Sequence, residues 1–478
     1  MANNEKREKI IKFLQDQISQ ADFRAEAYIF DENKKLRPKR NIYIKLHKYF
    51  TDFFEHKSTA RWLILTGLRG AGKTTIMSQL YYVEKNRDVR RLYLSVDHIV
   101  QILGVGLNDV LEAYEDLIGV AMERLDKPLY LFLDEIQYDE KWAITLKSLY
   151  DRSKNVFIFA TGSSALNLNT NPDIARRAIF EKLFPLSFVE YMKIKTGKSE
   201  TAGLRKEVRR VIFNSVSAVD VYAGMRRIEN RINEYWIDIE RMEMERYMRY
   251  GSLPFMVMLN NEALVYDQIN KTLDRIINSD VARTGQFNSE TISKIPSILY
   301  ATADIEQLSY VKLSEIFNIS RPKIMEIFNA LEKTETLIRV YPHGSHLNQV
   351  KKPSKYLFAS PAFRSMYYNF IGNVISKENY SGKLLEDTIG MYLSRFLFKK
   401  INTSLTYDNA QGGADFILGF AREKIIIEVG MGNKGISQVI QTASKVKAKY
   451  GLVISKNELN IFEKENIVQI PLKYFLLV

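Results

Sequence analysis

One short segment carries residue types suited to holding a chain of phosphates. It reads Gly67-Leu68-Arg69-Gly70-Ala71-Gly72-Lys73-Thr74, followed by Thr75. Glycines let backbone N–H groups approach an oxyanion, lysine neutralises the terminal phosphates, and the threonine hydroxyl can ligate Mg²⁺. The spacing is that of a phosphate loop when a buried strand precedes it and a helix follows, as the flanking apolar run and the amphipathic stretch to Val83 indicate. The predicted nucleotide-binding residues are Gly67, Gly70, Ala71, Gly72, Lys73, Thr74 and Thr75.

Two adjacent acids end a second apolar run further along the chain. The run Leu129 to Leu133 has the composition of a buried strand and leads directly into Asp134 and Glu135. Asp134, together with Thr74, is placed to hold Mg²⁺, and Glu135 is placed to orient and polarise an attacking water. The pair therefore favours ATP hydrolysis over binding alone, although adjacent acids that cap a strand are also common as plain loop residues.

Further candidates follow a third apolar run, Val156 to Ala160. Thr161 could place a hydroxyl between the γ-phosphate and the water, or it could belong to a hydroxyl-rich turn that caps a helix. Arg176 and Arg177 could reach a neighbour's γ-phosphate and stabilise transition-state charge, or they could be a surface pair. The predicted catalytic set is Glu135, Lys73, Thr161, Arg176 and Arg177.

Short apolar runs that alternate with amphipathic stretches predict an α/β fold with a parallel sheet covered on both faces. The expected strands are Trp62 to Thr66, Arg91 to Val96, Leu129 to Leu133 and Val156 to Ala160. Residues 1–60 are expected to be helical, with a linker at Pro38 inside a basic cluster of Lys34, Lys35, Arg37, Lys39 and Arg40. The P-loop core is assigned to residues 61–192.

Three further regions are expected after the P-loop core. Residues 193–290 combine a flexible insertion, Lys193 to Lys206, with charged helices that would form a lid. Residues 291–382 follow the order helix, turn, helix and hairpin, with Ser320 as the helix cap of the second helix. Arg321 and Lys323 begin that helix, and Lys351, Lys352 and Lys355 would flank the hairpin, so these basic residues are candidate DNA contacts. The same arrangement can also serve only to pack against protein. Residues 383–478 would form a separate α/β unit.

The sequence resembles the AAA+-like ATPases of archaea and bacteria that join a P-loop module to a C-terminal region combining a winged helix with a restriction-endonuclease-like fold. The resemblance covers most of the chain. It rests on Gly67 to Thr75, Leu131 to Gln137, Thr161 to Ala165, Leu183 to Tyr191 and Tyr247 to Pro254. The resemblance implies a P-loop NTPase sheet with the phosphate-loop strand placed centrally, ATP and Mg²⁺ as cofactors, and a homo-oligomer for which a hexameric ring is a candidate form.

The last region resembles the PD-(D/E)xK nuclease core in Glu386, Asp415 and Glu428. Gly430 stands where that core has its lysine, which would stabilise charge during cleavage. Lys434 or Lys424 could replace it in space. A degenerate nuclease fold that is kept for binding is therefore favoured over an active nuclease.

Composition sets wider limits on function. The chain has 478 residues, a formal charge of +13 and no cysteine. A positive excess favours a polyanionic partner such as DNA, although lysine also serves solubility. The absence of cysteine excludes disulfides and fits a cytoplasmic location, and no apolar run is long enough to cross a membrane. The function that follows is an ATP-driven motor or remodeller of duplex or branched DNA, and the alternatives are a nucleotide-gated switch for a protein partner and an active nuclease.

Overall fold

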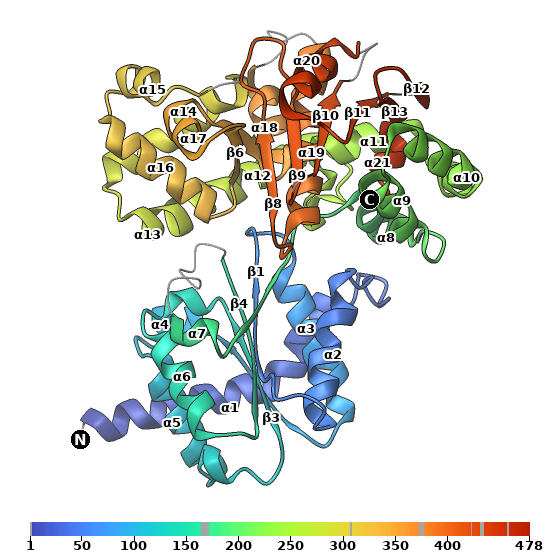
Figure 1. Cartoon of the computed structure of the whole chain (residues 1–478). Coiled ribbons are helices and arrows are strands. Elements are labelled where there is room, and N and C mark those ends of the chain that lie inside the picture. Colours follow the sequence, from blue (N-terminus) through green and yellow to red (C-terminus); the bar gives the residue numbers. More distant parts are fainter. Residues whose placement is uncertain are drawn as a thin grey trace. The chain divides into compact units, whose positions relative to one another are not determined.

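The computed structural model describes residues 2–163, 172–305, 308–371, 377–421, 423–430, 435–456 and 458–478. The chain divides into two compact units, Met1–Phe184 and Pro185–Val478. Figure 1 shows both units and labels most of their helices and strands. The five regions expected from sequence remain predictions, but the sheets below show how the chain groups them.

The first unit is built on a parallel sheet of five strands in the order β2-β3-β4-β1-β5. The strands are β1 (Trp62–Thr66), β2 (Arg90–Ser95), β3 (Leu129–Asp134), β4 (Val156–Gly162) and β5 (Ile179–Lys182). The strand before the phosphate loop, β1, is an interior strand between β4 and β5, whereas the middle position belongs to β4. Sequence reasoning missed β5.

Helices lie on both faces of this sheet (Figure 1). They are α1 (Ala2–Ile29), α2 (Ile42–Phe54), α3 (Lys73–Val83), α4 (Val96–Ile102), α5 (Leu107–Ile118), α6 (Trp142–Arg152) and α7 (Pro172–Ala175). Side chains alternate along β3: Leu131 joins the core that includes α1, α5 and α6, whereas Phe132 packs on Phe50 of α2 with ring centroids 5.5 Å apart. Because both faces are covered, the interior strands must be apolar at every position, which explains why their sequences run without polar breaks.

The second unit begins with helices. They are α8 (Phe188–Thr196), α9 (Leu204–Asn214), α10 (Ala218–Trp236), α11 (Arg241–Arg246), α12 (Glu262–Arg275), α13 (Ala282–Gly285), α14 (Ser289–Asp304), α15 (Tyr310–Phe317) and α16 (Arg321–Lys333). Single π-helical turns occur at Tyr247–Gly251 and Ile276–Val281. Helices α8 to α10 share one hydrophobic core with the C-terminal sheet, so the region expected to be a lid is part of the core of this unit.

A mixed sheet of eight strands completes the unit, in the order β12-β13-β11-β10-β9-β8-β6-β7. Its strands are β6 (Leu337–Pro342), β7 (Lys355–Phe358), β8 (Thr403–Tyr407), β9 (Phe416–Phe420), β10 (Glu423–Val429), β11 (Tyr450–Ser455), β12 (Asn460–Phe462) and β13 (Ile467–Pro471). The remaining helices are α17 (His346–Lys351), α18 (Pro361–Ile371), α19 (Lys377–Leu397), α20 (Ser437–Val446) and α21 (Leu472–Phe475). The hairpin β6–β7 joins this sheet through a parallel pairing of β6 with β8, so residues 383–478 do not stand apart from the hairpin.

Within the described ranges, no helix is long and apolar enough to cross a bilayer.

Candidate functional site

The loop between β1 and α3 has the backbone conformation that a phosphate cradle requires. Gly67 has φ of +152°, and a Cβ atom at this position would collide with the carbonyl oxygen of Leu183. Gly72 occupies the N-cap of α3 with φ of +97°, a left-handed conformation that strains any residue with a side chain. The two glycines therefore allow the loop to turn tightly into the N-terminus of α3, where free amides point outward.

Lys73 lies inside this loop. It is 5% exposed, and its Nζ donates to the carbonyl oxygens of Gly67 at 2.8 Å and Leu68 at 3.3 Å. Two neutral carbonyl oxygens of the loop thus hold the ammonium group. A phosphate oxygen is a stronger acceptor for an ammonium group than a carbonyl oxygen, so a triphosphate can replace these bonds favourably.

Asp134, at the end of β3, is the centre of a polar cluster that it forms with one residue each of α3, β2 and β4. Its Oδ2 accepts a hydrogen bond from the Thr74 hydroxyl at 2.8 Å and from the Tyr93 hydroxyl at 3.3 Å, and its Oδ1 accepts one from Thr161. Burial, and next the charge of Glu135, raise the pKa of Asp134 above its ordinary value. A bound cation would favour the ionised form of this carboxyl group.

The residues of this cluster fit a magnesium ion that is shared with phosphates. Mg²⁺ commonly keeps several waters and takes one or two carboxylates together with phosphate oxygens. The Thr74 hydroxyl and the Asp134 carboxylate already contact each other at the end of the phosphate loop. The sequence-derived pair of magnesium ligands is therefore brought together by the fold.

Glu135 adopts a left-handed conformation, with φ of +57° directly after β3. Its backbone N–H donates to the Thr161 hydroxyl at 3.2 Å, and its carboxylate accepts a hydrogen bond from the Gln137 side chain. Gln137 in turn accepts a hydrogen bond from the backbone N–H of Ser163 at 3.3 Å. Thr161 and Gln137 thus join the ends of β3 and β4 on either side of Glu135. Sequence reasoning missed Tyr93 and Gln137, although Gln137 lies only two positions after Glu135.

Arg40 is a second residue whose place the sequence did not reveal. The sequence groups it with exposed basic residues, but it is only 7% exposed. Its guanidinium donates to the carbonyl oxygen of Ala71, inside the phosphate loop, and to that of Phe184, each at 2.9 Å. Arg40 therefore positions the loop from outside and ties it to the chain after β5.

Arg176 and Arg177 do not join this cluster. They precede β5, which runs parallel to β1, whereas the phosphate loop follows β1, so the arginines lie at the amino ends of the strands and the loop lies at the carboxyl ends. Arg176 is exposed, and Arg177 forms an ion pair with Asp151 of α6 at 2.9 Å. A role toward the nucleotide of a neighbouring subunit stays a prediction.

The candidate DNA contacts lie on α16 and near the β6–β7 hairpin. Arg321 is exposed in the first turn of α16, and Lys323 pairs with Glu326 at 2.8 Å. Lys352 is exposed and donates to Asn409 at 3.1 Å, whereas the side chain of Lys351 lies outside the described residues. Ser320 stands at the N-cap of α16, but its side chain makes no capping hydrogen bond.

The expectation for Lys355 was wrong. Instead of flanking the hairpin in solvent, its buried Nζ forms ion pairs with Glu386 of α19 and, at 3.4 Å, with Asp415. Asp415 also accepts a hydrogen bond from Val429 N at 3.0 Å, and its own N–H donates to Glu428 at 3.2 Å. Lys355, Glu386, Asp415 and Glu428 thus form what we call the acidic centre. Its lysine comes from β7, whereas the sequence suggested Lys424 or Lys434. Lys424 instead contacts His343 at 3.3 Å. Lys434 lies outside the described residues.

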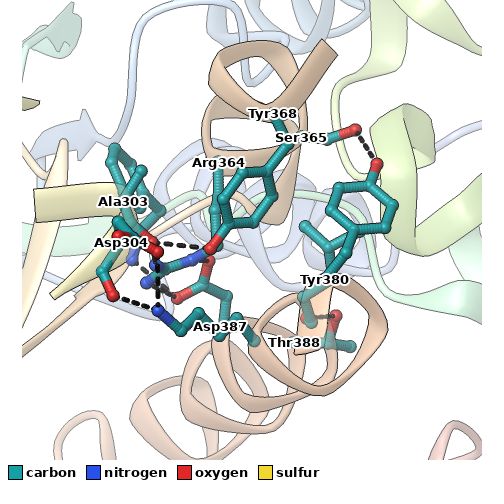
Figure 2. Close-up of polar contacts among 11 residues, drawn as sticks. Ala303, Asp304, Arg364, Ser365, Tyr368, Tyr380, Asp387 and Thr388 are labelled. Atoms are coloured by element: carbon teal, nitrogen blue, oxygen red, sulfur yellow. Dashed lines mark hydrogen bonds and ion pairs between the residues drawn. The ribbon is translucent and has the colours of Figure 1, made fainter. Parts of the chain in front are cut away.

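A neighbouring ion pair joins Arg364 of α18 to Asp387 of α19 (Figure 2). Asp387 is fully buried and accepts hydrogen bonds from Arg364 at 2.6 and 2.9 Å and from Phe358 N at 3.0 Å. Arg364 also donates to the carbonyl oxygen of Ala303 at the end of α14. The consecutive acids Glu386 and Asp387 are therefore both tied to β7, which positions the acidic centre.

The comparisons with known proteins agree with the geometry of the first unit. Residues 59–192 match the family described as AAA domain. Together with the parallel sheet and the Lys73–Asp134 cluster, this match makes the first unit an AAA-type P-loop nucleotide-binding domain.

Relatives extend the likeness beyond this domain. Uncharacterized protein MJ1637 of Methanocaldococcus jannaschii is 38% identical over 425 residues, which are 87% of this chain and 84% of that protein. The chain belongs to the same family as MJ1637. A second protein of that organism, MJ1544, is 20% identical over 378 residues, which are 77% of this chain and 74% of that protein.

Solved structures give a weaker likeness. Aeropyrum pernix ORC1 in complex with DNA aligns with a TM-score of 0.32 and 12% identity, over 71% of this chain and 95% of that chain. A Thermotoga maritima RuvB variant aligns with a TM-score of 0.30 and 15% identity, over 64% and 90%. Both TM-scores are low, so neither likeness bears on function.

Proposed function

We propose that the protein is an ATP-hydrolysing AAA+ protein that acts on DNA as a motor or remodeller of duplex or branched DNA. The observation that carries the catalytic part is the cluster in which Thr74 and Thr161 both donate to Asp134 while Glu135 follows directly after the same strand. These groups lie beside the loop that holds Lys73. A site built only to bind nucleotide would have no need of a carboxylate aligned next to the magnesium ligand.

Each residue has a separate task in this proposal. Amides of the loop and Lys73 would bind the β- and γ-phosphates, and Thr74 with Asp134 would hold Mg²⁺, which would neutralise charge on the phosphates. Glu135 accepts a proton from the attacking water and orients it, with its own position set by Gln137. Thr161 donates to Asp134 and accepts from the backbone N–H of Glu135, so it fixes the position of the proposed base relative to the proposed metal ligand.

Action on DNA is supported by charge and by the arrangement of the second unit. The chain carries a formal charge of +13, and binding to nucleic acid releases counterions in proportion to the phosphates neutralised. Helices α15 and α16 with the β6–β7 hairpin give the order expected of a winged helix, in which the second helix enters the major groove. Arg321 and Lys323 at its start, with Lys351 and Lys352 at the hairpin, are the proposed DNA contacts.

The nuclease-like region is proposed to bind rather than to cleave. Among the described residues, no group of three or more His, Cys, Asp or Glu side chains is placed to hold a metal ion. In the acidic centre the ammonium of Lys355 contacts both Glu386 and Asp415, so an internal cation already neutralises these carboxylates. This internal ion pairing supports the proposal that the region binds rather than cleaves.

Assembly and location remain part of the proposal. A homo-oligomer, with a hexameric ring as the candidate form, would let Arg176 or Arg177 reach the nucleotide of the next subunit, since both lie at the amino ends of the strands and their own phosphate loop lies at the carboxyl ends. The proposed location is the cytoplasm.

The test is the ATPase rate of the full chain measured across single-stranded, duplex and branched DNA, with particle size recorded in the same samples. Turnover is expected to rise with DNA and to vanish in Lys73→Ala. Arg321→Gln should remove the DNA-dependent increase and leave basal turnover unchanged, whereas Lys312→Gln, an exposed residue on the neighbouring helix α15, should leave both unchanged. Equal turnover on all DNA forms, with tightly retained nucleotide, would instead favour the switch that gates a protein partner.

A further inference from the structure

A cluster of cations in the second unit is made of residues that belong to none of the sites described above. Arg205 and Arg209 are four positions apart on α9, so they share one face of that helix. Arg395 of α19 is close enough that its positive charge lowers the pKa of both. Lys400, three residues beyond the end of α19, adds a further positive charge near Arg209. We call Arg205, Arg209 and Arg395 the arginine cluster.

The carboxylate that the cluster contacts is already engaged. Glu190 pairs with Arg395 at 2.8 Å and accepts a hydrogen bond from Ser187 N at 3.2 Å as part of the capping box of α8. Glu190 is 2% exposed, so it is surrounded by protein. The charges of Glu190 and, for Arg205, of Glu200 also act on the arginines of α9, but burial and the neighbouring cations outweigh them.

The side chains of Arg205 and Arg209 form no hydrogen bond and no ion pair with any residue in the described part of the chain. In both, the Nε atom is buried without an acceptor, although each residue as a whole is partly exposed. Nε–H and one terminal N–H of a guanidinium lie parallel, and this pair of donors matches two oxygens of a phosphate or carboxylate. The donors that would form such a fork therefore lack an acceptor.

Their surroundings make this lack of a partner costly. Burial, and next the charge of Arg395, lower the pKa of Arg205. Burial, then Arg205 and Arg395, lower the pKa of Arg209 to about 9. A guanidinium stays protonated at neutral pH, so the folded chain holds these like charges close together. An anion bound between them would relieve both the repulsion and the unmet hydrogen bonds.

We propose that the arginine cluster is a binding site for a phosphate-type oxyanion, with Arg205 and Arg209 as its two forks and Arg395 as a third charge. The phosphate could come from a small molecule, such as inorganic phosphate or a polyphosphate, or from the backbone of a nucleic acid. The chemistry of recognition is the same for both. None of its residues belongs to the phosphate loop, and binding there would not depend on ATP hydrolysis.

The experiment uses the full chain carrying Lys73→Ala, so that the phosphate loop contributes little to anion binding. Inorganic phosphate and tripolyphosphate are titrated at constant ionic strength, with Tm and calorimetric heat as readouts. The variants Arg205→Gln and Arg209→Gln are compared with Arg210→Gln, which removes one charge from an exposed position of the same helix. A second titration replaces phosphate with a short oligonucleotide and follows binding at several salt concentrations.

A saturable rise in Tm is expected in the parent and in Arg210→Gln. Removing either fork should weaken the binding about tenfold or more, as expected for a hydrogen bond between charged groups. If the backbone of a nucleic acid is the source, the oligonucleotide signal responds instead, and its salt slope falls by about 1 for each arginine that no longer reaches a phosphate. Arg209→Lys, which keeps the charge but removes the fork, should bind with intermediate affinity and serves if a glutamine variant does not fold.

A matched readout without ligand separates binding from a structural role. In buffer free of multivalent anions, Arg209→Gln should be at least as stable as the parent, because it removes one of several adjacent like charges. The proposal is overturned if neither phosphate nor oligonucleotide gives a saturable signal, or if Arg210→Gln weakens binding as much as the fork variants do.

Discussion

Replacing Lys355 by methionine should destabilise the second unit strongly. Methionine keeps the length and apolar stem of lysine, so the change removes the ammonium group with little loss of packing. The ammonium group is what holds Glu386 and, at 3.4 Å, Asp415. Two carboxylates would then remain together with no cation between them, and each would disfavour the ionisation of the other.

The size of the effect follows from how far these side chains are removed from water. The side chain of Lys355 is 11% exposed, and those of Glu386 and Asp415 are 19% and 21% exposed. Removing one partner of a buried ion pair costs about 3–5 kcal/mol, and the partial exposure of the carboxylates favours the lower end, about 3 kcal/mol. At about 2–4 °C per kcal/mol, this loss lowers Tm by roughly 6–12 °C.

The stability difference between the two proteins should depend on pH. Burial alone would raise the pKa of Glu386, but Lys355 outweighs it and holds the pKa below its ordinary value. Stability from this pair is therefore present above the unfolded-state pKa of about 4.3 and is lost as pH falls through the lower folded pKa. In Lys355→Met that pKa should rise instead, so acid should reduce the difference between the two proteins.

Urea unfolding followed by tryptophan fluorescence at pH 7 and pH 4 measures this prediction. The control is Lys352→Met, an exposed lysine three residues earlier, which should cost almost nothing. Adding Glu386→Gln to Lys355→Met should restore part of the stability, because one of the unpaired charges is then removed. A loss below about 1 kcal/mol, or a loss that is equal at both pH values, would show that the acidic centre is not a coupled ion cluster.

Three further changes test the nucleotide site. Glu135→Gln should lower the ATPase rate by about 10²- to 10⁴-fold while nucleotide affinity stays unchanged, because it removes the base but no phosphate contact; an equal fall in affinity would contradict its role. Thr161→Val should slow hydrolysis about tenfold or more, since Asp134 and the N–H of Glu135 are each deprived of a buried partner, and an unchanged rate would place Thr161 outside the catalytic set. Arg40→Met should weaken nucleotide binding about tenfold, because the Ala71 carbonyl is left without its charged donor, whereas the exposed Arg37→Met should not; similar effects of the two would refute the positioning role.

The strands that could be predicted are those whose burial leaves a continuous apolar run in the sequence. β3 and β4 are buried along their whole length, so their uninterrupted apolar sequences predict them directly. β5 has four residues, Ile-Phe-Glu-Lys, half of them charged, and as an edge strand it carries no such pattern. β8 was also missed, although it is an interior strand, because three of its five residues are Thr or Ser and it has no apolar run.

Site residues that are contiguous in the sequence could be predicted, whereas those that only the fold brings together could not. The phosphate loop is contiguous, so its spacing alone identifies Lys73 and Thr74. Lys355 meets Glu386 and Asp415 across 31 and 60 residues of sequence, and only the pairing of distant elements brings them together. Arg40 reads as one of several surface cations, although it is buried against the loop. A lysine or arginine is usually exposed to solvent. Lys355 and Arg40 are buried instead, because each donates to specific buried acceptors.

The measurement that tests the central claim most directly is a crystal structure of the full chain grown with Mg²⁺ and a nonhydrolysable ATP analogue. The triphosphate should lie in the loop from Gly67 to Thr74, with the Lys73 ammonium released from the Gly67 carbonyl to the phosphates, Mg²⁺ at the Thr74 hydroxyl and Asp134, and a water facing Glu135. A triphosphate bound elsewhere, or a loop that stays closed on Lys73 at saturating nucleotide, would contradict the assignment.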